Sequence, residues 1–138
     1  MIDDHLEPLS KAIATRLRDA CLDLGTTMTS SNGVLRVEWP SYNTAVAEPL
    51  VLDCGGEPSL HWFKGYMVDF PSFEDRQVDE IVKFLEGFFA ERIACGVRIV
   101  DGKVSRGGPV RFEGDPPNSW WTEPDTIIRS WRGSRDRG

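Results

Sequence analysis

Few side chains in this sequence are suited to acid–base, metal or nucleophilic chemistry. His5 and His61 are the only histidines, and neither has a cysteine or carboxylate nearby at the spacing that binds zinc. A Ser–His or Cys–His nucleophile pair stays open, because members of a catalytic triad need not be close in sequence. No Gly-x-Ser-x-Gly elbow is present. We therefore expect no metal, no cofactor and no enzymatic activity.

The cysteines give no sign of a metal or disulfide site. Cys21, Cys54 and Cys95 are far apart in sequence, odd in number and next to apolar residues, which predicts reduced and mostly buried thiols. The chain begins Met-Ile-Asp-Asp-His, without the basic and apolar regions of a signal peptide, and no apolar run is long enough to span a bilayer. Together these features predict a cytoplasmic protein that has no membrane partner.

The most informative segment is the Pro-rich, acidic stretch 114–125, which contains Trp120 and Trp121. In an extended segment, neighbouring side chains point to opposite sides, so we expect one indole to pack inward and the other to face solvent. An exposed Trp is a frequent anchor of protein interfaces. The predicted partner-binding residues are these two tryptophans, their acidic neighbours and two weaker candidates in earlier turns and strands: Trp120, Trp121, Glu113, Asp115, Glu123, Asp125, Glu57 and Asp69.

The charge of the chain is unevenly distributed. The whole sequence carries −6, residues 129–138 hold four arginines against one aspartate, and residues 1–128 therefore carry −9. Such a body repels nucleic acid and attracts a partner with a basic surface. The alternative is that the negative charge only keeps the protein in solution.

Hydrophobic periodicity predicts the elements that position these residues. Apolar residues recur every three or four positions over 4–24 and 72–94, which indicates two amphipathic helices, the second starting at Ser72. Strands are predicted at 34–39, 50–54, 60–63, 66–70, 97–100, 103–104, 110–112 and 126–131. Asp101-Gly102 suits a type I′ hairpin turn.

This order of elements predicts one α+β domain over residues 1–138. We expect a single, mainly antiparallel twisted sheet of about five or six strands, with two principal helices packed on one face. The Arg- and Gly-rich residues 132–138 are predicted to form a flexible tail.

The layout resembles that of the immunity proteins of bacterial polymorphic-toxin and contact-dependent inhibition systems, which are small acidic α+β domains. The ending Ser130-Trp131-Arg132-Gly133-Ser134-Arg135-Asp136 also resembles a Ser-Trp-x-Gly-x-x-Asp ending of bacterial proteins of similar length. The first resemblance implies a cognate toxin domain whose active site is occluded. The element order is also similar to that of type III secretion chaperones, which implies a homodimeric adaptor. A small-ligand enzyme is a third possibility, and the choice between monomer and homodimer stays open.

Overall fold

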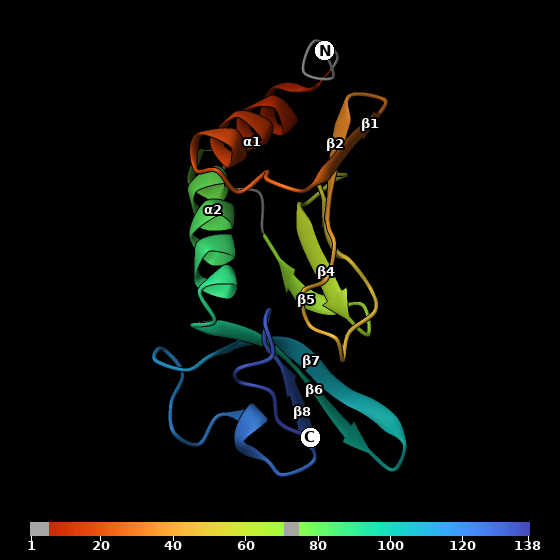
Figure 1. Cartoon of the computed structure of the whole chain (residues 1–138), viewed down its shortest axis with the longest axis vertical. Coiled ribbons are helices and arrows are strands. Elements are labelled where there is room, and N and C mark those ends of the chain that lie inside the picture. Colours follow the sequence, from red (N-terminus) through yellow and green to blue (C-terminus); the bar gives the residue numbers. More distant parts are fainter. Residues whose placement is uncertain (1–5, 71–74) are drawn as a thin grey trace.

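Two helices and two antiparallel sheets make up the protein, as described here from a computed structural model over residues 6–70 and 75–138. The predicted α+β class is confirmed. The prediction of one sheet is corrected, because the strands form a five-stranded sheet and a separate three-stranded sheet below it (Figure 1). His5, the start of the helix predicted over 4–24 and the predicted helix start at Ser72 lie outside the described residues.

The first sheet is a meander in which each strand pairs with the next along the chain. Its strands are β1 (Thr27–Ser31), β2 (Val34–Trp39), β3 (Leu50–Asp53), β4 (Ser59–Phe63) and β5 (Tyr66–Asp69). The links β1–β2 and β4–β5 are tight turns, in which Asn32-Gly33 and Lys64-Gly65 all have positive φ. Strand β1 was not expected, because Thr27–Ser31 is polar and exposed and so lacks the apolar alternation that marks a strand.

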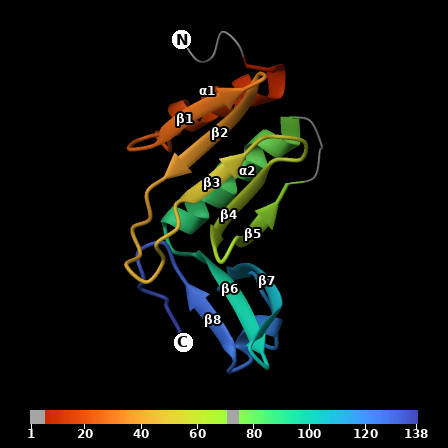
Figure 2. The same cartoon turned by 90° about the vertical axis from the view of Figure 1, so that its right-hand side faces the viewer.

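Helices α1 (Pro8–Asp19) and α2 (Asp75–Phe89) cover one face of this sheet and leave the other face open (Figures 1 and 2). Both helices are shorter than their apolar patterns predict. Cys21 has a φ of 57° just after α1, and Glu91 has a φ of 60° just after α2. A residue in this left-handed conformation ends a helix. The apolar residues that follow Glu91 therefore belong to a strand.

The second sheet contains β6 (Ile93–Val100), β7 (Lys103–Arg111) and β8 (Thr126–Arg129), in the order β7-β6-β8. The Asp101-Gly102 turn between β6 and β7 is confirmed, since both residues have positive φ. Strand β7 meets β5 through a side chain: a Cβ at Gly107 would lie 2.4 Å from the ring of Tyr66. The lack of a side chain at Gly107 therefore makes room for the Tyr66 ring between the two sheets.

An aromatic cluster joins the first sheet, α2 and the C-terminal segment. The ring centroid of Trp131 lies 5.6 Å from that of Trp62, 5.5 Å from Phe88 and 5.2 Å from Phe89. Trp62 and Trp39 are buried in the main core, as their strand alternation predicts. The core thus depends on Trp131, which lies after the last strand of the second sheet.

The Ser-Trp-x-Gly-x-x-Asp ending folds back and locks Trp131 in place. The hydroxyl of Ser130 and the backbone N–H of Arg132 donate hydrogen bonds to Glu91 Oε1, at 2.9 and 2.8 Å. Asp136 Oδ1 accepts a hydrogen bond of 2.9 Å from the backbone N–H of Ser130. Ile128 and Arg137 form an antiparallel bridge. Residues 132–138, expected to be a flexible tail, therefore lie in contact with Glu91, which follows α2, and with β8.

We expect Glu91→Gln to lower the free energy of unfolding by about 1–2 kcal/mol at pH 7, because charged hydrogen bonds are stronger than neutral ones. Partial burial alone would raise the pKa of Glu91, but hydrogen bonds from Ser134, Ser130 and the N–H of Arg132 hold the pKa below its ordinary 4.5. A lowered pKa in the folded state gives stability that is present above the unfolded pKa and lost as pH falls through the folded value.

Urea unfolding at pH 7 and pH 3 measures this effect. The difference between wild type and Glu91→Gln should shrink at pH 3. An equal difference at both pH values would contradict the role of the carboxylate charge.

Candidate functional site

The Trp-Trp segment packs on the outer face of the second sheet. After β7 the chain makes a loop, forms the short 3-10 helix η2 (Trp120–Thr122) and enters β8. In a 3-10 helix, successive side chains are about 120° apart and not on opposite sides as in an extended chain. Both indoles are therefore half-buried, and the expected division into one inward and one outward ring is corrected.

Trp121 belongs to a small second core. Its ring packs edge-on against Phe112, with centroids 5.8 Å apart, and contacts a cluster of Ala94, Val110 and Ile128. Its indole N–H donates a hydrogen bond of 2.8 Å to Asp115 Oδ2. Trp121 thus holds its loop on the sheet.

Trp120 lies beside Gly96 of β6 and under an arginine of β7. A Cβ at Gly96 would lie 3.1 Å from Cη2 of Trp120, so the absence of a side chain there makes room for the ring. The guanidinium carbon of Arg106 lies 4.9 Å from the centroid of the Trp120 ring. This distance is typical of a cation–π contact.

The carboxylates near the two tryptophans are partly engaged within the protein. Besides Trp121, the backbone N–H of Arg111 donates to Asp115 Oδ2, at 2.9 Å. Asp125 forms an ion pair of 3.0 Å with Arg98. Glu113 and Glu123 are exposed. Residues 92–138 carry nine basic and six acidic residues, so the surroundings of the loop have a net charge of +3 and not the expected negative charge.

The two weaker candidates lie on the first sheet and not beside the Trp-Trp segment. Glu57 is exposed in the connection between β3 and β4. Asp69, at the end of β5, lines a hollow of about 420 Å³ together with Glu80, Lys83 and Arg111. The structure therefore divides the eight predicted residues between two surfaces, one on each sheet.

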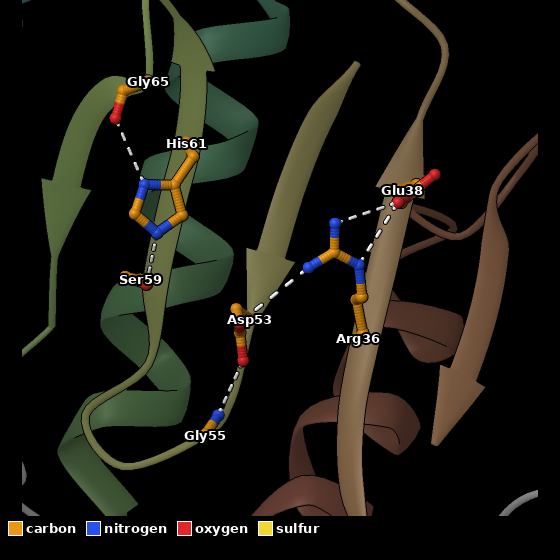
Figure 3. Close-up of polar contacts among 7 residues, drawn as sticks. All are labelled: Arg36, Glu38, Asp53, Gly55, Ser59, His61 and Gly65. Carbon is orange, nitrogen blue, oxygen red and sulfur yellow. Dashed lines mark hydrogen bonds and ion pairs between the residues drawn. The ribbon is translucent and has the colours of Figure 1, made fainter. Parts of the chain in front are cut away.

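The segment that forms the first sheet is acidic overall, and its open face carries charged side chains beside the apolar Val51 and Met67. Residues 27–70 hold five acidic and two basic residues, a net charge of −3. On this face, the Arg36 guanidinium lies between Glu38, at 3.1 Å, and Asp53, at 3.9 Å (Figure 3). Asp53 also accepts a hydrogen bond of 2.9 Å from the N–H of Gly55. The carboxylates of Glu38 and Asp53, which come from neighbouring strands, therefore lie on either side of Arg36 on the open face.

The same face carries a serine and histidine pair that sequence reasoning left open without naming the serine. Ser59 Oγ lies 2.8 Å from His61 Nε2, and His61 Nδ1 lies 3.2 Å from the carbonyl oxygen of Gly65 (Figure 3). Two residues that are two positions apart on a strand share a face. The spacing of Ser59 and His61 could therefore have predicted that their side chains lie together. His61 and Asp69 line one hollow of about 330 Å³, whereas Asp53 lies outside it.

The thiols differ in exposure. Cys54 and Cys95 are buried as predicted, while Cys21 is exposed because it lies in the turn that ends α1. Burial raises the pKa of Cys54 to about 12, with a further contribution from the Asp53 charge, and burial also raises the pKa of Cys95 to about 12. These two thiols therefore stay protonated at neutral pH. Among the residues that the structure describes, no three His, Cys, Asp or Glu side chains gather as metal ligands.

The sequence matches no protein-family profile, no curated protein and no solved structure. Across the described part of the chain, neither helix has the length and apolar character needed to cross a bilayer. Inferences about function must therefore come from the two surfaces themselves.

We expect Trp121→Ala to lower the free energy of unfolding by about 2 kcal/mol, because it opens a cavity beside Phe112 and leaves Asp115 with one hydrogen-bond donor fewer. Trp120→Ala should cost about 1 kcal/mol, since that ring is only half-buried and, within the described part of the chain, has no aromatic core partner. Thermal and urea unfolding measure both values. If both variants unfold at room temperature, the segment is purely structural and its assignment to partner binding is wrong.

Proposed function

We propose that this chain is a non-enzymatic, cytoplasmic binding protein that neutralises a bacterial toxin domain by covering its active site. The observation that carries this proposal is the open, predominantly acidic face of the first sheet, which no helix covers (Figure 2). Residues 1–91 carry −9 and residues 92–138 carry +3, so the molecule has one strongly acidic half. Complementary charge speeds association with a basic partner and selects against other partners.

The arrangement of this face supports binding through many moderate contacts. Its carboxylates come from different strands and are held by Arg36 and by Gly55, so several are ordered before a partner arrives. Ordered groups lose less conformational entropy on binding. The substrate groove of a toxin that acts on nucleic acid would itself be basic, and an acidic face complements it. Glu57 and Asp69 belong to this surface, whereas the Trp-Trp segment lies on the second sheet, outside it.

Co-expression with the product of the adjacent gene tests the proposal. If that product is toxic, we expect this protein to restore growth, and the purified pair to elute as one complex. A toxic neighbour that is neither bound nor neutralised would remove the support for this function.

The homodimeric adaptor is the runner-up, and its oligomeric state distinguishes it. A chaperone of the type III secretion class requires a stable dimer, so sedimentation of this chain as a monomer at micromolar concentration would exclude it.

A nucleophilic hydrolase is favoured by one observation, the 2.8 Å contact between Ser59 Oγ and His61 Nε2. A proton on Nδ1 facing Gly65 would leave Nε2 free to accept the serine proton, as a general base does. Hydrolysis of p-nitrophenyl acetate that is lost in both Ser59→Ala and His61→Gln would support this function. Equal rates in wild type and both variants would exclude it for simple esters.

A further inference from the structure

A hollow of about 340 Å³ opens beside Trp120 on the second sheet. Its lining residues come from β7, from the loop that follows it and from η2, and include Arg106, Gly107, Gly108, Arg111, Ser119 and Trp120. It is separate from the open acidic face of the first sheet. Its lining also includes one carboxylate, Asp115, whose Oδ2 accepts hydrogen bonds from the Arg111 N–H and the Trp121 indole N–H. Two arginines against one aspartate still give the hollow a positive charge.

Both guanidinium groups are positioned by aromatic rings. Arg106 lies over Trp120 at 4.9 Å, and Arg111 lies over Phe84 of α2 at 5.6 Å. Within residues 6–70 and 75–138, neither side chain forms an ion pair. A guanidinium stacked on a ring keeps its N–H edge free to bind an oxyanion with two hydrogen bonds.

The neighbouring strand strengthens the positive potential. Arg98 of β6 is the register partner of Arg106 of β7, so two like charges stand directly opposite each other. Such a pair destabilises a sheet unless other charges compensate it. Asp125 pairs with Arg98 at 3.0 Å, which leaves the charge of Arg106 for another anion.

We propose that this hollow binds an acidic segment of a protein, with one carboxylate held by Arg106 and a second by Arg111. The inference does not rest on the proposed toxin inhibition, because it concerns the other sheet and a partner of the opposite charge. Gly108 also lines the hollow and has no side chain there to obstruct an approaching peptide, whereas the space over Gly107 is filled by the Tyr66 ring.

Single-stranded nucleic acid fits this surface less well than an acidic peptide. Sequence-tolerant binding of single strands uses open aromatic faces on which bases stack. The Arg106 guanidinium already lies over the indole of Trp120, and Cη2 of that ring lies close to Gly96. The net charge of −6 also repels a long polyanion, whereas a short acidic segment contacts only the basic patch.

The test is a titration of the full chain, labelled with ¹⁵N, with an acetylated and amidated hexaglutamate peptide at low salt. We expect saturable shifts of the Gly107 and Gly108 amides and of the Trp120 indole N–H. Arg106→Gln and Arg111→Gln should each weaken binding by about fivefold or more, and Arg106→Lys should weaken it less, because it keeps the charge but loses the planar fork.

Arg92→Gln is the matched control. It removes the same charge at an exposed position just before β6, outside the hollow, and should leave binding unchanged. Inorganic phosphate and a ten-nucleotide oligothymidine are the competing probes, and both should bind more weakly than the peptide. Circular dichroism establishes that each variant is folded.

Three results would overturn the proposal. The first is the lack of saturable shifts with hexaglutamate. The arginines would then serve only to prevent the edge strand β7 from pairing with a strand of another molecule. The second is an equal loss in Arg92→Gln, which would show only general charge attraction. The third is tighter binding of oligothymidine, which would assign the surface to nucleic acid.

Discussion

Trp131→Ala should lower the free energy of unfolding by about 3–5 kcal/mol, a large part of the stability of a domain of this size. Trp131 is 3% exposed, and its ring contacts Trp62, Phe88 and Phe89. Its removal leaves a cavity where the first sheet, α2 and the C-terminal segment meet. The surrounding rings are held by two different elements, β4 and α2, so they cannot easily collapse to fill it.

Urea unfolding followed by circular dichroism measures this loss. Tyr42→Ala is the matched control, because Tyr42 contacts Trp131 from the outside and is 67% exposed. We expect the control to cost less than about 1 kcal/mol. Equal losses in the two variants would contradict the central position of Trp131.

The second large effect concerns the acidic face. Replacing both Glu57 and Asp69 with Lys should weaken binding to a basic partner by about 100-fold, which corresponds to about 2.7 kcal/mol. Both side chains are exposed, so their replacement changes the surface potential and leaves the core intact. Most of the change should appear as slower association that depends steeply on salt.

Asp19→Lys combined with Glu86→Lys is the control for this variant. It makes the same change in net charge on exposed positions of α1 and α2, on the side of the sheet that the helices cover. We expect nearly unchanged affinity after this replacement. If both double variants lose affinity equally, the partner senses only the net charge and no particular face.

Local sequence patterns predicted the elements that are defined by their own residues. The alternation of Leu35, Val37 and Trp39 identifies an inner face of β2, and Asp101-Gly102 identifies a hairpin turn, because both signals depend on neighbouring positions only. Strand β1 was missed because an exposed polar edge strand carries no such signal. The division into two sheets was missed because it depends on which strands pair across the chain, and β6 pairs, among the described strands, only with β7 and β8.

The candidate site was predicted in part. The sequence pointed to Trp120, Trp121 and their acidic neighbours, but it could not show that Arg98 and Arg106 approach them from the β6–β7 hairpin. It also could not show that Glu91 accepts hydrogen bonds from the Ser-Trp-x-Gly-x-x-Asp ending. These bonds give that motif a structural role, because they hold the C-terminal segment on the rest of the fold. Charges that meet through tertiary contacts are not visible in local composition.

Hydrogen exchange of this protein, measured with and without the product of the adjacent gene, tests the proposed binding face most directly. The account predicts that amides of β2 to β5, on the open face of the first sheet, become more protected on binding, and that the exposed surfaces of α1 and α2 do not. Protection confined to the helices, or a toxic neighbour whose presence changes no amide of this protein, would contradict it.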